Sequence, residues 1–382
     1  MVIPAHPSEP RSPESIAWAY LARVAEPPCA AVIALVDDIG PVEAAAAIRR
    51  RTVPGGHETV LAATAARSES DCAVDDLDAA ERVGARLVTR ADPEWPAWSL
   101  LALGQADTAA RGGEPLALWV RGPARLDDLA AASIALIGSR AASSYGEHVT
   151  QTLASGLSAQ GFAVLSGGAF GIDGAAHRAV VAAGGVTAAV MACGIDRDYP
   201  ASHSSLLTAI ARTGAVISEY PPGTTAAKHR FLTRNRLVAA MSGATVVVEA
   251  GRRSGAANTA AWARKLGRPL GAVPGPVTSA TSVGCHRMIA DELAVLVSDV
   301  ASVINLVRPD GGGDIGRGRA KPTDALDAEQ LRVHDAIPGR GGVGIDEIAF
   351  AAGLDIGTVR AALAHLDIKG YVQNVDGRWR LA

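Results

Sequence analysis

Residues 228–236 combine, in nine positions, four fixed cations with one aromatic ring, one amide and no carboxylate. The segment reads Lys-His-Arg-Phe-Leu-Thr-Arg-Asn-Arg, and Glu249 is the only carboxylate between Lys228 and Arg268. Cations neutralise phosphates, and an aromatic side chain offers a face on which an unpaired base can stack. The pattern therefore predicts a contact surface for single-stranded nucleic acid, with candidate contacts at Lys228, Phe231, Arg234, Asn235 and Arg236.

Two loops rich in small residues, over residues 133–140 and 162–173, each follow a short apolar run and precede a helical pattern. Backbone N–H groups at the start of a helix bind anions, and glycine lets a ligand approach the backbone closely. If the two runs are neighbouring parallel strands, the loops lie side by side and can hold successive phosphates. The candidate contacts are Gly138, Ser139 and Arg140 in the first loop and Ser166, Gly167 and Gly168 in the second.

Neither loop carries the fingerprint of a dinucleotide-binding fold. The G-x-G-x-x-G spacing is absent after Gly138, and no acidic residue ends the second strand to hold a ribose hydroxyl. Arg140 instead places a planar cation beside the helix, which suits a phosphodiester. The structural alternative is that Gly138 and Ser139 only form the turn and that Arg140 pairs with an acid. Asp173 is interpreted as a brace of the following helix, and His177 as its structural partner rather than a catalytic base.

The segments around these loops alternate between short apolar strands and helical patterns from Ser133 to Val303. The alternation predicts an α/β domain with an extended Rossmann-like, doubly wound and mostly parallel sheet. Ligands of such sheets bind beyond the carboxyl ends of the strands. The expected strands cover residues 134–137, 163–165, 187–191, 215–218, 244–249 and 270–273, and two further strands over 85–89 and 116–122 lead into the sheet.

Four segments are expected along the chain. Residues 1–84 form a small N-terminal helical module (SAM-like or helix-hairpin-helix-like), in which the Gly40-Pro41 turn more often joins helices than binds DNA. Residues 85–307 form the Rossmann-like domain, and the Gly-rich residues 308–323 form a flexible linker. Residues 324–382 carry helical patterns over 328–337, 345–352 and 356–369 and a hairpin that turns at Asp376-Gly377, which predicts a winged helix.

Composition narrows the class of protein. The 382-residue chain is 48% apolar and carries a net charge of −3, so any nucleic-acid site depends on local clustering of cations. The four cysteines form no metal or redox spacing and indicate a reducing compartment. The chain opens on polar residues and contains no apolar run of membrane-spanning length. We therefore expect a cytoplasmic protein without metal, cofactor or membrane partner.

Several motifs occur in a fixed order. They are Ala-Leu-Ile-Gly-Ser-Arg (135–140), Ser-Gly-Gly-Ala-Phe-Gly-Ile-Asp (166–173), Ser-Glu-Tyr-Pro (218–221), Lys228 with Phe231, Arg-Asn-Arg (234–236) and Val-Pro-Gly (273–275). In this order the motifs resemble the DNA-processing protein A (DprA/Smf) family over nearly the whole chain. The resemblance implies a homodimeric, non-enzymatic protein that protects single-stranded DNA and loads the RecA recombinase onto it during competence, transformation and recombination. It also implies that the family's DNA contacts fall on the candidates named above.

The sequence departs from the family pattern in places. Leu232 stands where a proline is usual, and His203 stands where an asparagine is common. Residues 282–286 read Ser-Val-Gly-Cys-His instead of Ser-x-Gly-x-Asn, so that contact is not carried over.

Two other functions compete with single-strand binding. A nucleotide-binding enzyme of the related phosphoribohydrolase (lonely-guy-like) branch would use a Pro-Gly-Gly-x-Gly-Thr loop and a downstream glutamate at the ribosyl bond. That loop is absent here, and residues 228–236 suit a polymer better than one nucleotide. A transcription regulator would instead use residues 356–369 as a recognition helix, in which the only candidate contacts are Arg360, His365 and Lys369.

Overall fold

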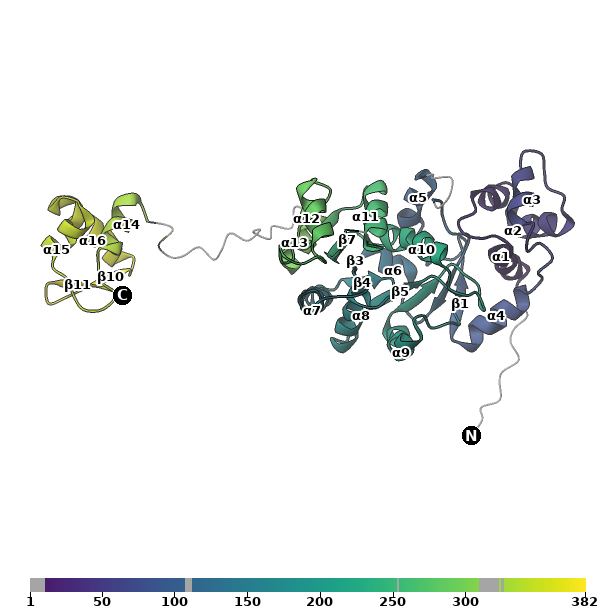
Figure 1. Cartoon of the computed structure of the whole chain (residues 1–382), viewed down its shortest axis with the longest axis horizontal. Coiled ribbons are helices and arrows are strands. Elements are labelled where there is room, and N and C mark those ends of the chain that lie inside the picture. Colours follow the sequence, from purple (N-terminus) through teal and green to yellow (C-terminus); the bar gives the residue numbers. More distant parts are fainter. Residues whose placement is uncertain (1–10, 107–111, 253, 309–322, 324–325) are drawn as a thin grey trace, which may run out of the picture. The chain divides into compact units, whose positions relative to one another are not determined.

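The computed structural model describes residues 11–106, 112–252, 254–308, 323 and 326–382. It divides the chain into two compact units, Met1–Gly313 and Asp314–Ala382, each of which is described by itself (Figure 1). The expected linker over residues 308–323 lies almost entirely outside the described residues.

The sheet of the first unit consists, within the described residues, of β1 (Ala85–Val88), β2 (Leu118–Arg121), β3 (Ser133–Gly138), β4 (Ala163–Ser166), β5 (Thr187–Met191), β6 (Ala215–Ser218), β7 (Ala244–Glu249), β8 (Leu270–Ala272) and β9 (Val295–Leu296). Its strand order is β1-β2-β6-β5-β4-β3-β7-β8-β9. Strands β3 to β9 are parallel, whereas β1 and β2 form an antiparallel edge beside β6. The prediction of a doubly wound, mostly parallel sheet is confirmed, although the short β9 was not predicted.

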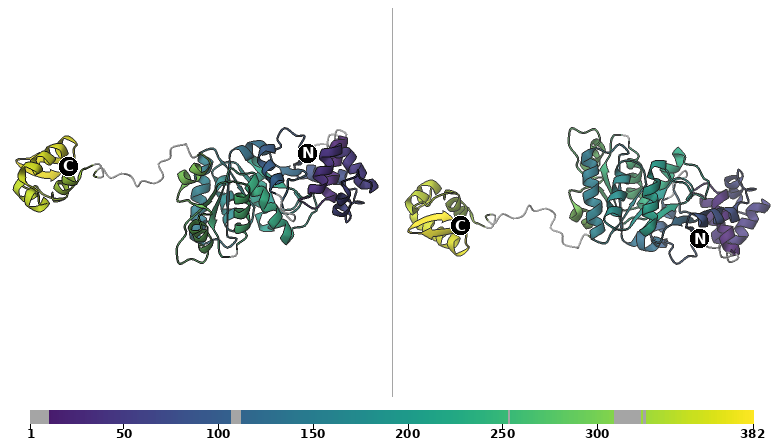
Figure 2. Two further views of the ribbon diagram at one scale, coloured as in Figure 1. Left: turned by 90° about the horizontal axis from the view of Figure 1, so that it is seen from above. Right: turned by 90° about the horizontal axis from the view of Figure 1, so that it is seen from below.

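Helices cover both faces of the sheet: α5 (Ala97–Gln105), α6 (Leu126–Ala131), α7 (Ser144–Ala159), α8 (Ile172–Ala182), α9 (Ser204–Thr213), α10 (Lys228–Ala240), α11 (Ala256–Lys265), α12 (Val283–Ala290) and α13 (Val300–Val307) (Figure 2). Alternate residues of β3 face opposite layers. Ala135 and Ile137 share an apolar cluster with α5, α10 and α11, and Ile134 and Leu136 share another with α7, α8 and α13. Because both faces are buried, the central strands are apolar throughout.

The residues before β1 fold into helices that pack on the sheet: α1 (Pro13–Val24), α2 (Ala30–Arg50), α3 (Glu58–Thr64) and α4 (Ala73–Arg82). Their apolar side chains share one buried cluster with Trp119 of β2, Met191 of β5 and Val216 of β6. Within α2, Gly40 takes a φ of 78° and Pro41 follows, so the helix kinks at the expected turn. The N-terminal helices and the sheet are therefore one compact unit.

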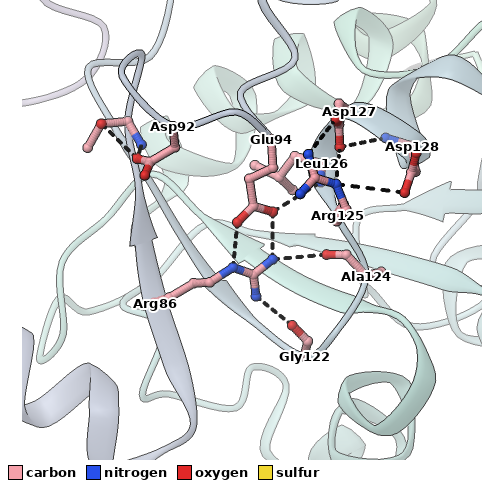
Figure 3. A network of polar contacts seen from close by, with 10 residues as sticks. Arg86, Asp92, Glu94, Gly122, Ala124, Arg125, Leu126, Asp127 and Asp128 are labelled. Carbon is pink, nitrogen blue, oxygen red and sulfur yellow. Dashed lines mark hydrogen bonds and ion pairs between the residues drawn. The ribbon is translucent and has the colours of Figure 1, made fainter.

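An ion pair fastens β1 at the edge of the sheet (Figure 3). The Arg86 guanidinium donates to both carboxylate oxygens of Glu94 at 2.7 Å and to the carbonyls of Gly122 and Ala124 at 2.6 and 3.1 Å. Because β2 runs antiparallel to β6, the C-terminal end of β2 lies beside the N-terminal ends of the parallel strands. This ion pair therefore lies at the N-terminal end of the sheet. The carboxyl ends of those strands lie at the opposite end of the sheet.

The second unit is a winged helix built from α14 (Ala328–Asp335), α15 (Ile345–Ala352), α16 (Ile356–Ile368), β10 (Val372–Val375) and β11 (Arg378–Leu381). The helices enclose a small core that contains Val333, Ile348 and Leu363. Asp376 and Gly377 both take positive φ at the tip of the hairpin, as the Asp-Gly sequence predicted. The prediction of a winged helix is confirmed.

Among the residues that the structure describes, no single helix is long and apolar enough to cross a bilayer. Helices α15 and α16 meet the test of length and composition only as a pair, and they are bent by 105° at the break between them.

Candidate nucleic-acid interface

A cleft with a volume of about 780 Å³ lies beyond the carboxyl ends of the parallel strands. It is lined by the loops after β3, β4, β5 and β7 and by α10 with the residues that precede it. The chain passes from β3 to β4 on one side and from β7 to β8 on the other, so the cleft lies at the topological switch point of the sheet, where doubly wound folds bind ligands. The glycine loops and the basic helix, which are far apart in sequence, therefore meet at one site.

Eight of the candidate residues line this cleft: Gly138, Ser139, Arg140, Gly167, Lys228, Phe231, Arg234 and Asn235. The remaining three, Ser166, Gly168 and Arg236, are buried outside its lining. The hydroxyl of Ser166 donates to the carbonyl of Leu136 at 2.6 Å, which makes its contact internal to the sheet.

An exposed cation and two aromatic rings form a cluster in the cleft lining. The guanidinium carbon of Arg140 lies 5.2 Å from the centroid of the Phe231 ring, a distance at which a cation and an aromatic face attract each other. The ring of Tyr199 also contacts Phe231, with 5.3 Å between the centroids. Arg140 forms no ion pair among the described residues, so the alternative in which an acid neutralises it does not hold there.

The backbone N–H at the start of the helix that follows the first loop is not open to an outside anion, contrary to expectation. Helix α7 begins at Ser144, and the N–H of Ser143 before it donates to the Glu249 carboxylate at 2.9 Å. The hydroxyl of Ser143 donates to the other oxygen of Glu249 at 2.5 Å. The carboxylate of Glu249 therefore occupies the position at this helix terminus that a phosphate was expected to take.

The second loop also holds an anion of the protein itself. A carboxylate oxygen of the buried Asp173 accepts hydrogen bonds from the N–H groups of Gly167 at 3.1 Å and Ala169 at 3.3 Å. Burial raises the pKa of Asp173, and the nearby Arg234 acts in the opposite direction. Asp173 is thus architectural, as predicted, but it braces the loop before the helix.

The prediction that His177 pairs with Asp173 is wrong. The Nδ1 atom of His177 lies 2.7 Å from the hydroxyl of Thr187 on β5. Burial lowers the pKa of His177 to about 3, with smaller contributions from His203 and Arg234. A neutral, buried histidine hydrogen-bonded to a strand has a structural role.

Packing inside the protein explains why two of the loop positions are glycine. A Cβ atom on Gly138 would lie 2.5 Å from a side-chain carbon of Ile172, and one on Gly167 would lie 2.4 Å from a guanidinium nitrogen of Arg234. Both distances are well inside van der Waals contact. These glycines are therefore required by their neighbours in the fold, whatever ligand the cleft binds.

Two arginines of the basic segment are drawn into the protein. Arg236 is fully buried and forms a two-pronged ion pair with Glu219, with N–O distances of 2.6 and 2.8 Å. Its position does not support the prediction that it contacts DNA. Arg234 is 4% exposed at the base of the cleft, where it donates to the carbonyls of Gly167 (2.6 Å) and Val190. Burial lowers the pKa of Arg234, whereas Asp173 raises it.

A third arginine of the segment is paired with a glutamate from the segment that follows α1. Arg230 donates to both carboxylate oxygens of Glu26, at 2.8 and 3.0 Å. Among the described residues, the exposed cations that line the cleft are therefore Arg140 and Lys228. The basic surface is smaller than the sequence predicted, because acids from distant parts of the chain pair with its arginines.

Sequence reasoning left out two residues of the site. Tyr199 contacts Phe231, and its position before a proline in the loop that follows β5 was the available signal. Asn258 of α11 accepts a hydrogen bond from the side-chain amide of Asn235 at 3.1 Å. This contact spans two helices, and no local pattern predicts it.

Family models, related sequences and solved structures all relate this chain to DNA processing proteins. The family model described as DNA recombination-mediator protein A matches residues 86–308, and the DprA winged helix domain model matches residues 317–378. A Mycobacterium tuberculosis protein named DNA processing protein DprA is 51% identical over 97% of this chain and 95% of its own length. The Escherichia coli protein Smf is 32% identical over 69% of this chain and 71% of its own length.

Solved structures of the same family resemble this fold. DNA processing protein A from Streptococcus pneumoniae aligns with a TM-score of 0.62 at 26% identity and covers 77% of this chain and 97% of its own. The Helicobacter pylori protein, reported for its single-stranded DNA binding mode, aligns with a TM-score of 0.51 at 26% identity and covers 59% of this chain and 96% of its own. With its motifs, its sheet and its winged helix in agreement, this chain belongs to the DNA processing protein A (DprA/Smf) family.

Proposed function

We propose that this chain binds single-stranded DNA in the cleft at the carboxyl ends of β3 to β7. The observation that carries the proposal is the cluster of Arg140, Phe231 and Tyr199 in a cleft that Lys228 also lines. Aromatic rings stack on bases whose faces are free, and cations beside them neutralise the adjoining phosphates. In a duplex the base faces are stacked on one another, so this arrangement favours a single strand.

The polar contacts of the glycine loops support a polymer over a single nucleotide. A nucleotide pocket of the usual kind holds its phosphate on backbone amides. Here Glu249 already accepts a hydrogen bond from the N–H of Ser143 before α7, and Asp173 accepts two from amides of the second loop. Phosphates of a bound strand instead meet exposed side chains, such as those of Arg140 and Lys228. Extended contacts of this kind follow a backbone and carry little base information.

The proposed role is to bind the DNA strand without catalysing a reaction on it. Asp173 is the only carboxylate among the described residues that line the cleft, and its hydrogen bonds to the second loop commit it to holding that loop. A carboxylate held in this way is poorly placed to act on a substrate. Membership of the family supports the finer proposals: the protein acts as a homodimer in the cytoplasm, protects incoming strands and loads RecA onto them during transformation.

Fluorescence anisotropy with one labelled single strand, the matching duplex and AMP tests the proposal. Strong binding of the single strand, weaker binding of the duplex and no release of adenine are expected. The logarithm of the affinity should fall linearly with the logarithm of the salt concentration, and Arg140→Ala or Lys228→Ala should each reduce that slope by about 0.7. The control is Arg125→Ala, which lies at the N-terminal ends of the parallel strands, away from the cleft. Equal or tighter duplex binding, or release of adenine, would contradict the proposal.

A further inference from the structure

The first turn of α10 lacks the features that normally stabilise the start of a helix. Its N-cap is Ala227, whose side chain cannot accept a hydrogen bond from the unpaired N–H groups of the first turn. The turn contains no acidic residue and begins with Lys228, His229 and Arg230. Positive charge at a helix N-terminus is unfavourable because it adds to the positive end of the helix dipole. This turn carries Lys228 and leads directly into Phe231, so its position decides where both side chains lie.

A glutamate far away in the sequence supplies the missing negative charge. One oxygen of Glu26, in the segment after α1, accepts from Arg230 at 2.8 Å and lies 3.2 Å from Nε2 of His229. The other oxygen accepts from Arg230 at 3.0 Å and from Arg67 at 2.5 Å. Burial alone would raise the pKa of Glu26, but the hydrogen bonds from Arg230, Arg67 and His229 outweigh it and lower the pKa to about 2. The carboxylate is therefore charged at neutral pH.

A second contact from the same region holds the segment that leads into α10. Arg23, near the end of α1, donates to the carbonyl of Pro222 at 2.7 Å and pairs with Asp76 of α4. Arg230 itself donates to the carbonyl of Thr225 at 2.6 Å and lies 5.0 Å from the ring of Tyr220. Its side chain thus points away from the cleft, which it does not line. Releasing Arg230 would loosen the turn without adding a cation to the DNA path.

We propose that Glu26 is a positioning residue for the cleft: it holds the first turn of α10 and thereby places Lys228 and Phe231 for strand binding. The inference rests on the proposed function of the cleft, and it gives the N-terminal helices a specific part in that function. They brace the DNA-binding helix and do not themselves need to touch the strand.

Replacement of Glu26 by glutamine tests the inference. Glu26→Gln keeps the size of the side chain but removes the charge, and it should weaken binding of oligothymidine roughly three- to tenfold while the salt slope stays unchanged. Hydrogen exchange should become faster at the amides of the first turn of α10. Glu26→Asp, which keeps the charge, should restore part of the affinity.

The matched control is Glu94→Gln, which breaks another half-buried, two-pronged glutamate–arginine pair in the same unit (Figure 3). The Arg86–Glu94 pair lies at the end of the sheet opposite the cleft. Glu94→Gln should therefore lower the stability of the protein but leave DNA affinity and hydrogen exchange in α10 unchanged. An equal loss of affinity in both variants would show a general effect of stability and overturn the inference.

Other outcomes separate this inference from the proposed function. Unchanged affinity in Glu26→Gln would overturn the positioning role. Tighter binding with a steeper salt slope would also overturn it, because the freed cations would then be acting on the DNA directly. The proposed function is judged on the unmodified protein and on Phe231→Ala. If the unmodified protein fails to bind single strands, the proposed function is wrong irrespective of Glu26.

Discussion

Two faces of α10 both carry cations, but in opposite environments. The cleft face, defined by Lys228, Phe231 and Asn235, lines the cleft, and its lysine is exposed. The protein face, defined by Arg230 and Arg236, is paired with Glu26 and Glu219. A cation in a sequence is therefore a candidate for phosphate binding only if no acidic side chain pairs with it in the folded protein. The two faces predict different consequences of mutation.

The largest effect is expected on the protein face, at Arg236. Replacing Arg236 with methionine leaves the Glu219 carboxylate buried without its partner, which should lower the free energy of unfolding by about 3–5 kcal/mol. Urea denaturation followed by circular dichroism measures it. The double variant Arg236→Met/Glu219→Met should recover much of the loss, because no unpaired charge remains.

Lys228→Met is the matched control from the cleft face and should leave the free energy of unfolding nearly unchanged, because Lys228 is exposed. If Arg236→Met folds with normal stability but loses DNA binding, Arg236 belongs functionally to the cleft face and the division between the faces fails.

The next effect is expected on the cleft face, at Phe231. Phe231→Ala removes the ring on which a base stacks and should weaken single-strand binding by about 1–3 kcal/mol. Anisotropy titration at fixed salt measures the affinity, and thermal melting checks that the variant is folded. Trp98→Ala, which removes a ring that is 83% exposed on α5, is the control and should bind normally. Normal affinity in a folded Phe231→Ala variant would leave the cleft face with its cations alone.

The smallest effect concerns the pH dependence of the Glu26 pair. The pKa of Glu26 is lowered from its ordinary 4.5 to about 2 in the folded protein. Stability from this group is therefore fully present above pH 4.5 and is lost as the pH falls toward 2. Because the side chain is 32% exposed, solvent screening reduces the contribution to about 1–2 kcal/mol.

Denaturation curves of the unmodified protein and of Glu26→Gln should therefore differ at pH 7 and converge as the pH falls to about 2. Glu14→Gln, which removes an exposed carboxylate of α1, is the control and should give parallel curves. A difference that persists at the acid end would mean that Glu26 stabilises the protein by packing rather than by charge.

Much of the fold was predictable because its signals are local. Apolar runs of three to six residues, separated by helical patterns, predicted each strand from β3 to β8 within a residue or two at either end. The Asp376-Gly377 pair predicted the hairpin of the winged helix for an equally local reason, since its turn requires positive φ. The two-residue β9 escaped prediction because so short a segment carries no period.

The site was predictable only in part. The sequence indicated the cleft residues because loops at the carboxyl ends of parallel strands must converge. It did not indicate that the Glu249 and Asp173 carboxylates would bind the amides of those loops, or that Thr187 would be the partner of His177. Each of these contacts joins segments that the sequence alone does not place together.

The sequence by itself determined the sheet, the winged helix, the family and the concentration of cations in residues 228–236. Only the tertiary structure decided which of those cations face a ligand. Arg230 and Arg236 are separated from their acid partners by 204 and 17 residues, and the folded chain brings each pair within 3 Å. The physical reason is that burial makes an unsatisfied charge costly. The fold therefore supplies Glu26 to Arg230 and Glu219 to Arg236, satisfies the buried Arg234 with backbone carbonyls, and leaves Lys228 and Arg140 in water.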